Sequence, residues 1–463
     1  MTSAPPTSDV LVVGAGLSGL ACALWLERRG ARVTVLEKSA VPGGAMGSAR
    51  DQDFLVERGP NSALETTPLF AELFTAAGIE GEKLIANPAA SKRYILRNGR
   101  LIPLPMSPPA FLATPLFSLG AKLRLFREPF IGRGAGEETV AQFVRRRLGQ
   151  EFLDYAINPF VAGVYAGDPE RLSVPAAFPR LAELEHKYGS LIRGQIQGAK
   201  ERKRRAEQSK QSAPMFSFRD GMGALPRALA AKLADLRLGV TVEAVERSPA
   251  GYRARGRDAA GAPVDVAAPC LVLATPAYAA APLLAPLAPD AADALAGIEY
   301  PPVAVVATGY RPAPGMHPLD GFGFLIPAKE NRRILGTLFS STLFPGRAPD
   351  GRVLLTSFVG GMRQPELARQ ADADLVAMVA GEQRALLGCP AAPEFSRVTR
   401  WERAIPQYAP GHLQRMERLS RAEADLPGLF FCANYRGGIS VGDCVKSAHA
   451  MAERVAGFLG VAG

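Results

Sequence analysis

The residues with the clearest chemical meaning form a glycine-rich turn near the start of the chain. The stretch GAGLSG, residues 14–19, has the spacing G-x-G-x-x-G. In such a turn the first glycine permits a tight bend, the second lets a pyrophosphate approach the backbone, and the third lets a helix pack closely on a strand. We therefore expect a bound dinucleotide to contact Gly14, Ala15, Gly16, Leu17, Ser18 and Gly19.

The segments around this turn have the order of a βαβ nucleotide-binding unit. The pattern predicts an apolar strand over 10–13, a helix that starts at Leu17 and stops at Gly30, and a second strand that ends at Glu37. The start of the helix offers unpaired N–H groups and a positive dipole end to the phosphates. Glu37 is placed to accept hydrogen bonds from the ribose hydroxyls, and it disfavours NADP because its charge would repel the extra phosphate.

The cysteines and histidines show no spacing typical of a metal site. The five cysteines are scattered without a C-x-x-C pair, and the four histidines never fall at ligand spacing from one another. This pattern predicts free thiols in a reducing compartment and no metal centre.

The size and charge of the chain limit its class. Its 463 residues favour two or three domains, and the hydrophobic content of 48% excludes a disordered chain. The net charge of +10 favours an anionic partner, such as a membrane surface, nucleic acid or an acidic substrate. No run of eighteen apolar residues exists, and the first residues lack a signal-peptide pattern. We expect a cytoplasmic protein that is soluble or lies on a membrane surface.

A glycine pair after the second strand narrows the dinucleotide to FAD. It resembles the second phosphate-side motif, usually R-x-G-G, of flavoproteins in the GDI and amine-oxidase superfamily. Val41 stands where the arginine normally lies, which puts one charged contact in doubt, and Lys38 is the candidate to replace it. The resemblance implies further FAD contacts at Lys38, Gly43, Gly44, Gly59, Pro60, Asn61 and Ser62.

Glycines precede a helix a second time near the end of the chain. After Gly437 and Gly438, the apolar positions keep helical spacing from Val445 to Leu459. This second helix start could face the N1–C2=O edge of the isoalloxazine, where negative charge develops on reduction. Cys432 and Cys444 bracket the turn and are interpreted as small buried fillers without a disulfide.

The order of the predicted elements indicates an α/β FAD-binding domain of the Rossmann-like GDI/amine-oxidase type, assembled from separated pieces. The apolar stretch 270–273 reads as another strand of its parallel sheet. Segments rich in β-branched and aromatic residues, with an Asn98–Gly99 turn, indicate a mixed α+β substrate domain that is mostly antiparallel. The predicted boundaries are 1–90, 212–300 and 395–463 for the FAD-binding domain, 91–111 and 301–394 for the substrate domain, and 112–211 for a helical membrane-associating domain.

The helical block permits two interpretations. Between Phe111 and Phe126, apolar and aromatic residues alternate with cations, as in a helix that lies in a lipid interface. An ordinary amphipathic helix packed on its own domain explains the same pattern equally well. The basic run at 200–205 has no aromatic platform or recognition helix beside it, so we expect a solvated segment and no nucleic-acid binding.

Over nearly its whole length the chain resembles the oxygen-dependent protoporphyrinogen oxidase family. The motifs GAGLSG and NYRGGISVGDC (434–444) are shared with many flavin oxidases, whereas AGVYAGDPERLSV (162–174) and LGTLFSSTLFPGRAP (335–349) are more particular. GPNS (59–62), KRYILRNGRL (92–101) and GFGFLIP (321–327) add to the match. The resemblance implies FAD-dependent oxidation of protoporphyrinogen IX to protoporphyrin IX by molecular oxygen, with hydrogen peroxide released, in haem synthesis. It also implies a homodimer on the cytoplasmic face of a membrane.

Carried over by position, the resemblance assigns substrate contacts to five residues. Arg93 would bind a propionate, Gly163 would present its carbonyl to the pyrrole N–H groups, and Phe358 would stack on one ring. Leu325 and Leu338 would enclose another ring. Further FAD contacts are implied at Val242, Trp401, Ile439, Ser440 and Val441.

The expected chemistry needs no catalytic side chain. A porphyrinogen methylene beside an electron-rich pyrrole can transfer hydride directly to flavin N5, so catalysis would come from positioning and flavin electrostatics. One alternative is oxidation of coproporphyrinogen III, which has four propionates, to coproporphyrin III by the same fold. Another is a GDI-like binding protein that has lost the flavin.

Overall fold

A five-stranded parallel sheet carries the first glycine turn, within the residues that the computed structural model describes, 8–197 and 213–461. Its order is β10 (Asp235–Leu238), β2 (Val33–Glu37), β1 (Val10–Val13), β14 (Cys270–Leu273) and β20 (Leu429–Phe431). All neighbouring pairs are parallel, although the strands come from three separated stretches of sequence. The predicted strands at 10–13 and 270–273 are confirmed, and the basic run at 200–205 lies outside the described residues.

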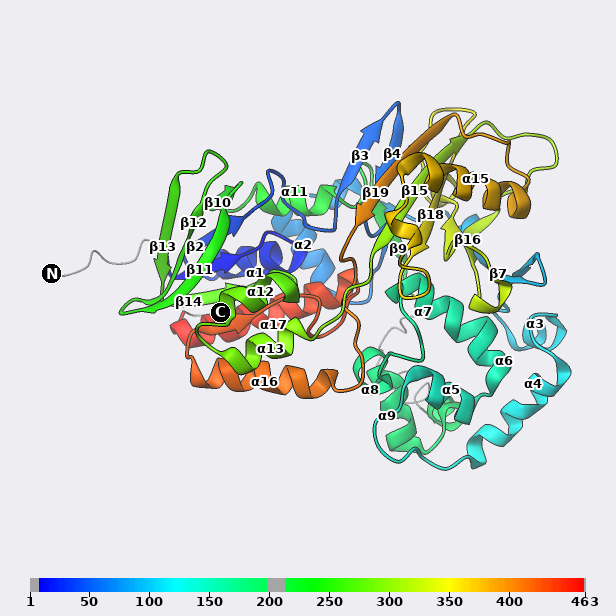
Figure 1. Ribbon diagram of the computed structural model, residues 1–463, viewed down its shortest axis with the longest axis horizontal. Coiled ribbons are helices and arrows are strands. Elements are labelled where there is room, and N and C mark those ends of the chain that lie inside the picture. Colours follow the sequence, from blue (N-terminus) through cyan, green and yellow to red (C-terminus); the bar gives the residue numbers. More distant parts are fainter. Residues whose placement is uncertain (1–7, 198–212, 462–463) are drawn as a thin grey trace.

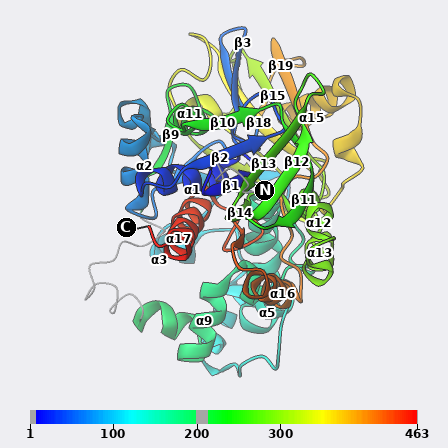
Figure 2. The ribbon, with the colours of Figure 1, turned by 90° about the vertical axis from the view of Figure 1, so that its left-hand side faces the viewer.

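Two layers cover this sheet (Figures 1 and 2). Val10 and Val12 face one core, whereas Leu11 and Val13 face the other, as the alternation along a strand requires. The first layer consists of α1 (Leu17–Arg28), α2 (Leu69–Ala77), α11 (Ala224–Ala230) and α17 (Val441–Leu459). The second consists of β11 (Thr241–Ser248), β12 (Gly251–Arg257), β13 (Pro263–Ala268), α12 (Ala277–Leu284), α13 (Pro289–Ala296) and α16 (His412–Asp425). The predicted helices that follow the two glycine turns are α1 and α17.

A seven-stranded mixed sheet forms the second large unit. Its order is β19 (Phe395–Trp401), β15 (Val303–Tyr310), β18 (Val353–Gly360), β17 (Gly336–Leu338), β16 (Gly321–Leu325), β7 (Lys92–Arg97) and β8 (Arg100–Pro103). Every neighbouring pair is antiparallel except β16–β7, which is parallel. Asn98 and Gly99 take positive φ angles of 53° and 72° and form the predicted hairpin turn between β7 and β8. β19 pairs with β15, so residues 395–401 lie in this sheet and not in the FAD-binding piece to which the sequence assigned them.

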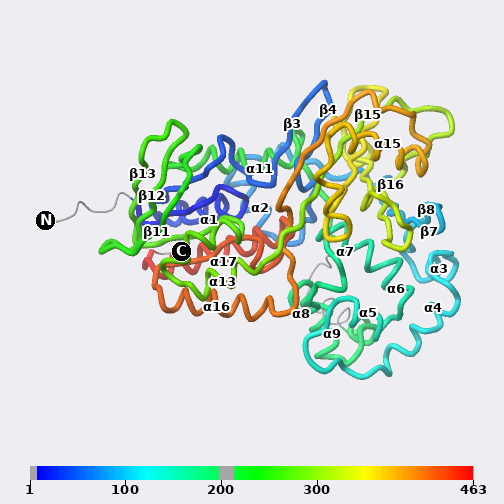
Figure 3. The backbone as a smooth tube through the Cα atoms, viewed as in Figure 1, coloured from blue at the N-terminus to red at the C-terminus, as the bar shows by residue number. Residues whose placement is uncertain are grey.

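Between β8 and β9 (Met215–Phe218) the chain makes a mainly helical excursion, drawn in cyan and green in Figure 3. Its elements are α3 (Pro108–Ala113), α4 (Leu119–Arg124), η3 (Leu125–Phe130), α5 (Val140–Arg147), α6 (Gln150–Phe152), η4 (Leu153–Ile157), α7 (Asn158–Tyr165), α8 (Val174–Ala177) and α9 (Pro179–Tyr188). Helix α7 crosses the end of the seven-stranded sheet, where Ala162 and Ala166 pack with Val303 and Leu335. Among the described helices, none is both long and apolar enough to cross a membrane.

Short elements fill the junction between the two large sheets. The hairpin of β3 (Ser48–Asp51) and β4 (Phe54–Glu57) projects beside the seven-stranded sheet (Figure 1). A small sheet joins β5 (Ala63–Leu64), β9 and β6 (Lys83–Ile85), and α14 (Ser340–Leu343) follows β17. The helix α15 (Asp372–Leu387) covers the side of the seven-stranded sheet that faces away from α7.

Candidate functional site

The first glycine turn has the shape that a dinucleotide requires. Gly14 takes a φ of +108°, and a Cβ on Gly19 would collide with the carbonyl oxygen of Gly14. The space around Gly16 is open, so a phosphate could approach the backbone at that position. Leu17 and Ser18 begin α1, with Gly16 as the N-cap. The turn therefore brings its six predicted residues to the carboxyl end of β1.

Glu37 lies directly beside this turn. Its Oε2 accepts the N–H of Ala15 at 2.8 Å, and its Oε1 accepts the N–H of Ser39 at 2.8 Å. The carboxylate therefore shapes the glycine turn, a role that the sequence did not reveal. Each oxygen keeps capacity for a further hydrogen bond, so the predicted ribose contact is compatible with this geometry and stays a prediction.

The glycine pair 43–44 packs against the same turn. The N–H of Gly43 donates to the carbonyl of Ala15 at 2.8 Å, and a Cβ on Gly44 would lie 3.4 Å from the Cα of Gly16. Lys38 and Val41 are exposed. The structure thus unites the two predicted glycine motifs and leaves the contact from Lys38 a prediction.

The loop 59–62 and Trp401 form the next part of the site. The indole N–H of Trp401 donates to the carbonyl of Arg58 at 2.7 Å, and the amide of Asn61 donates to the carbonyl of Gly59 at 3.1 Å. Pro60 and Ser62 are half-buried in this loop. Val242 lies on β11, two residues after Val240, whose N–H donates to the carbonyl of Glu37. Trp401 therefore lies beside the loop 59–62 and Val242 lies near the end of β2, and their contacts with FAD stay predictions.

The second glycine turn follows β20, which β14 separates from β1 and the first glycine turn in the parallel sheet. Gly437 and Gly438 take φ angles of +85° and +120°, and the hydroxyl of Ser440 accepts the N–H of Asp443 as the N-cap of α17. α17 packs along α1, and the thiol of Cys432 lies 3.9 Å from the carbonyl of Ser18. Ile439 and Val441 are half-buried beside the turn, and all five cysteines are free thiols.

A buried tyrosine holds this second turn in place. The hydroxyl of Tyr408 donates to the carbonyl of Asn434 at 2.6 Å and accepts the N–H of Gly438 at 3.2 Å. Its ring stacks on His412, whose Nε2 lies 2.9 Å from the carbonyl of Tyr435. Burial lowers the pKa of His412 to about 4, so the neutral ring can donate this hydrogen bond through Nε2. No motif in the sequence pointed to Tyr408 or His412.

One orphaned polar atom tests whether these residues fit FAD. The hydroxyl of Thr275 is buried and has no hydrogen-bond partner among the described residues. Its side chain lies beside Gly14, because a Cβ there would be 3.2 Å from its methyl group. A donor without a partner beside an open glycine turn suits a phosphate. The residues therefore fit FAD, and Thr275, at the carboxyl end of β14, is a site residue that the sequence analysis missed.

The strand register places the predicted substrate residues on one face of the seven-stranded sheet. Leu338 pairs with Gly323 and Thr356, and Gly323 pairs in turn with Arg93. Leu325 and Phe358 both pair with Gly336, one step further along the strands. Residues that pair across strands, or that lie two apart in one strand, point to the same side. The four side chains therefore share a face.

Helix α7 borders this face at its far end. A Cβ on Gly163 would lie 2.6 Å from a methyl group of Leu325, so the exposed Gly163 touches the predicted substrate face. Phe358 and Trp401 pack beside Ala162 of this helix and Ala166, its C-cap. The five predicted substrate residues therefore surround one region, and Trp401 connects it to the loop 59–62.

Arg93 is the cation of this face, and its neighbour Lys92 is not. The guanidinium of Arg93 lies 5.6 Å from the ring centre of Phe322 and is exposed. Lys92 points to the opposite side of β7, where its ammonium pairs with Asp320, which also accepts the hydroxyl of Tyr94 at 2.6 Å. Lys92 is therefore already paired and turned away from the predicted substrate.

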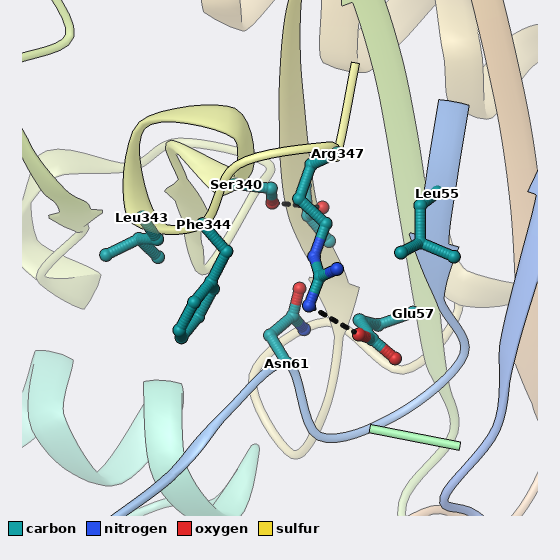
Figure 4. Close-up of a pocket in the computed structure, with 8 residues that line it drawn as sticks. Leu55, Glu57, Asn61, Ser340, Leu343, Phe344 and Arg347 are labelled. Carbon is teal, nitrogen blue, oxygen red and sulfur yellow. Dashed lines mark hydrogen bonds and ion pairs between the residues drawn. The ribbon is translucent and has the colours of Figure 1, made fainter. Parts of the chain in front are cut away.

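A small cavity lies where the loop 59–62 meets the seven-stranded sheet (Figure 4). Its lining consists of Leu55, Glu57, Asn61, Ser340, Leu343, Phe344, Arg347 and Thr356. Glu57 and Arg347 are buried within it, and burial raises the pKa of Glu57 to about 7 although the nearby Arg347 lowers it. Thr356 shares its strand row with Leu338, so the cavity adjoins the predicted substrate face.

The sequence of this chain matches a known protein family. Residues 17–456 match the model of the family described as flavin containing amine oxidoreductase. The chain is 35% identical to the chloroplastic protoporphyrinogen oxidase of Nicotiana tabacum, over 97% of this chain and 86% of the relative. It is 28% identical to the coproporphyrinogen III oxidase of Bacillus subtilis (strain 168), over 95% of this chain and 96% of the relative.

Solved structures show the same fold. A crystal structure of a protein from Exiguobacterium sp. 255-15 superposes with a TM-score of 0.81 at 24% identity, covering 98% of this chain and 99% of that chain. Cyclohexylamine oxidase from Brevibacterium oxydans IH-35A gives a TM-score of 0.71 at 18% identity, covering 98% of this chain and 100% of that chain.

Proposed function

The chain belongs to the flavin containing amine oxidoreductase family, and we propose that it oxidises protoporphyrinogen IX to protoporphyrin IX. As a member of this family it is an oxidoreductase that uses FAD. In the proposed reaction molecular oxygen takes the electrons from the reduced flavin and leaves as hydrogen peroxide. The observation that supports this proposal best is that the side chains of four residues share one face of the seven-stranded sheet, which Gly163 borders: Arg93, Leu325, Leu338 and Phe358. The names of the relatives from tobacco and from Arabidopsis thaliana support the substrate class.

The residues of this face suit a flat, largely apolar macrocycle with few carboxylates. Leu325 and Leu338 are half-buried, so a tetrapyrrole ring placed against them would remove further apolar surface from water. The planar guanidinium of Arg93 can hold a propionate through two parallel hydrogen bonds. The exposed Gly163 has no side chain to keep a pyrrole N–H from its carbonyl.

Bound FAD would supply the two-electron chemistry, accepting hydride at its N5 atom. The protein's part is to orient a methylene bridge of the substrate, to exclude water and to stabilise developing charge. The turn at Gly437–Gly438 and the start of α17 would present N–H groups to the flavin edge on which negative charge develops. No side chain has to donate or accept a proton at the reacting carbon.

The domain boundaries and the membrane contact belong to the same proposal. We assign FAD binding to 1–90, 212–300 and most of 395–463, substrate binding to 91–111 and 301–394, and membrane contact to 112–211. Five exposed apolar residues of this segment support the last assignment: Leu112, Leu119, Leu123, Phe126 and Phe130. A cluster of this kind on the surface favours insertion into a lipid interface over an ordinary packed helix.

Two of the cations expected to contact lipid headgroups are engaged within the protein. The ammonium of Lys122 donates to the carbonyls of Leu112 and Thr114, at 2.8 and 2.7 Å. Arg124 donates to the carbonyls of Arg145 and Arg146. The segment 108–130 also forms three short pieces and not one amphipathic helix. The proposed contact therefore relies on the apolar residues, with a homodimer peripheral on the cytoplasmic face as its expected form.

Coproporphyrinogen III is the second candidate substrate, because relatives from Bacillus subtilis and Staphylococcus aureus carry that name. The face described above favours the dicarboxylate, since Lys92 is turned away and two extra propionates would lose water without a charged partner. The other alternative from the sequence, a flavin-free binding protein, is opposed by the family match and by the intact glycine turn.

The experiment that tests the proposal starts from the purified protein. We expect flavin absorbance near 450 nm, which should bleach when protoporphyrinogen IX is added without oxygen. When air is admitted, the absorbance should recover and hydrogen peroxide should form. A colourless protein would favour the flavin-free binding protein. If coproporphyrinogen III bleaches the flavin and protoporphyrinogen IX does not, coproporphyrinogen III is the substrate.

A further inference from the structure

A buried ion pair connects the two parts of the protein that form the site. Arg347 follows α14 and lies in the motif 335–349, in which the sequence analysis gave a role to Leu338 but none to Arg347. Its guanidinium donates to the hydroxyl of Ser217 at 2.7 Å and to the carbonyl of Phe218 at 3.2 Å, and its Nη2 lies 3.5 Å from Oε1 of Glu57. The side chain of Arg347, from the segment between α14 and β18, thus reaches the junction around β4 and β9.

Glu57 is held just as firmly from the other side. Its Oε1 accepts the N–H of Met222 at 2.9 Å, and its Oε2 accepts the hydroxyl of Ser48. Ser48 in turn accepts the N–H of Gly223 at 2.8 Å. The pair therefore joins β3, β4, β9 and the turn before α11 to the loop that follows α14.

The burial of this pair argues for a role beyond stability. The side chains of Arg347 and Glu57 are 2% and 3% exposed. Removing two charges from water is costly, so a well-packed apolar pair often stabilises a fold as well or better. Buried ion pairs of this kind can instead fix one arrangement of the parts that they join.

The surroundings of the pair show what it holds in place. In Figure 4 the guanidinium of Arg347 points toward Glu57, with Asn61 beside it and Phe344 on the other side. Asn61 belongs to the loop 59–62, on the FAD side of the cavity. Ser340 shares a hydrogen bond of 2.8 Å with Thr356, in the strand row of Leu338. The pair thus lies between the flavin-side loop and the substrate face.

The charges near the pair come from three elements. Arg227 of α11 acts on Glu57 together with Arg347, whereas Arg50 of β3 and Asp220 act on Arg347. Burial affects both pKa values more than these charges do. The pKa of Glu57 is therefore raised and the pKa of Arg347 is lowered.

We propose that Glu57 and Arg347 are positioning residues for the reaction, which set the separation between the flavin-side loop 59–62 and the substrate face at Thr356 and Leu338. This inference rests on the proposed function, because it takes that face as the place where the substrate lies. Neither residue touches the reacting atoms. Both act through the loop and through α14, and an error of about 1 Å in such a separation can cost about a hundredfold in rate.

The test compares Arg347→Lys and Glu57→Gln with a matched control. The control is Arg147→Met, which breaks another fully buried arginine–glutamate pair, to Glu128, inside the helical excursion. We expect Arg347→Lys and Glu57→Gln to lower kcat at least tenfold and to change the visible circular dichroism of the bound flavin. Arg147→Met should lower only the melting temperature.

Two outcomes separate this inference from the proposed function. If the wild type oxidises no porphyrinogen but Arg347→Lys and Glu57→Gln still alter the flavin dichroism, the proposed substrate is wrong, whereas the effect of the pair on the flavin-side loop is confirmed. If the wild type turns over and both variants match the Arg147→Met control in kcat and dichroism, the pair has a structural role alone. Glu57→Gln keeps the side-chain shape, so it remains informative should an Arg347 variant fail to fold.

Discussion

The hydroxyl of Tyr408 accepts the N–H of Gly438 at 3.2 Å, and through this contact a tyrosine distant in sequence holds the second glycine turn. The same hydroxyl donates to the carbonyl of Asn434. Tyr408 therefore helps to fix the conformation of the turn, and with it the direction of the N–H groups at the start of α17.

Tyr408→Phe should weaken FAD binding and lower the flavin midpoint potential. The change removes both hydrogen bonds but keeps the ring that stacks on His412, so the turn loses its fixed geometry next to the negative charge of reduced flavin. We expect the dissociation constant of the apoprotein for FAD, measured by fluorescence titration, to rise about tenfold. Tyr310→Phe is the control, because that hydroxyl is also buried but donates to Gln383, between β15 and α15. Equal affinities and potentials in the two variants would show that Tyr408 does not act on the flavin.

Glu37→Ala should release FAD. It removes the acceptor for the N–H of Ala15 together with the predicted ribose contact, a loss of about 1.5–3 kcal/mol for a charged hydrogen-bonding group. The measurement is the ratio of flavin to protein absorbance after purification, with thermal stability alongside. Full flavin occupancy at unchanged stability would contradict both roles of Glu37.

Membrane binding should depend on the exposed apolar residues. Replacing Leu119, Phe126 and Phe130 together with Ser should abolish flotation with anionic liposomes, because these side chains are 72%, 74% and 82% exposed. Arg127→Ser should reduce flotation less, mainly at low salt. Flotation of the triple variant at the wild-type level would favour the alternative that the segment only packs on its own protein.

The stability of the protein should fall as the pH rises from about 5 to about 8. Burial raises the pKa of Glu57 to about 7 in the folded protein, whereas the unfolded chain releases this proton near its ordinary value of about 4.5. The contribution of Glu57 is therefore fully present below the lower value and is lost as the pH passes the higher one. Glu57→Gln should make the melting temperature depend less on pH over this range. A steeper dependence in the variant than in the wild type would contradict the raised pKa.

Local patterns in the sequence were sufficient for the nucleotide-binding unit. The strand at 10–13, the glycine turn and α1 lie within one short stretch, so their periodicity and glycine spacing predicted them. Assignments that depend on distant pairing were harder. Phe395–Trp401 read as part of the FAD-binding piece, but its partner is β15, almost a hundred residues earlier.

The same limit explains the site residues that were missed. Thr275 and Arg347 carry no local signature, because each one acts on a segment more than a hundred residues away in sequence. Tyr408 acts on a turn 30 residues later, which is also too far for a spacing pattern to reveal. The predicted substrate residues came from the resemblance alone. Their common face required the strand register, which no spacing along the chain reveals.

The measurement that tests the account most directly is kcat/KM for protoporphyrinogen IX and coproporphyrinogen III in the wild type, Arg93→Ala and Lys92→Ala. If Arg93 holds a propionate, its loss should raise KM roughly ten- to a hundredfold while flavin absorbance stays intact, since a charged hydrogen bond contributes about 1.5–3 kcal/mol. Lys92→Ala should behave like the wild type, because Lys92 points to the other side of β7 and pairs with Asp320. We expect the wild type to prefer the dicarboxylate. A higher kcat/KM for coproporphyrinogen III, or equal effects of the two substitutions, would contradict it.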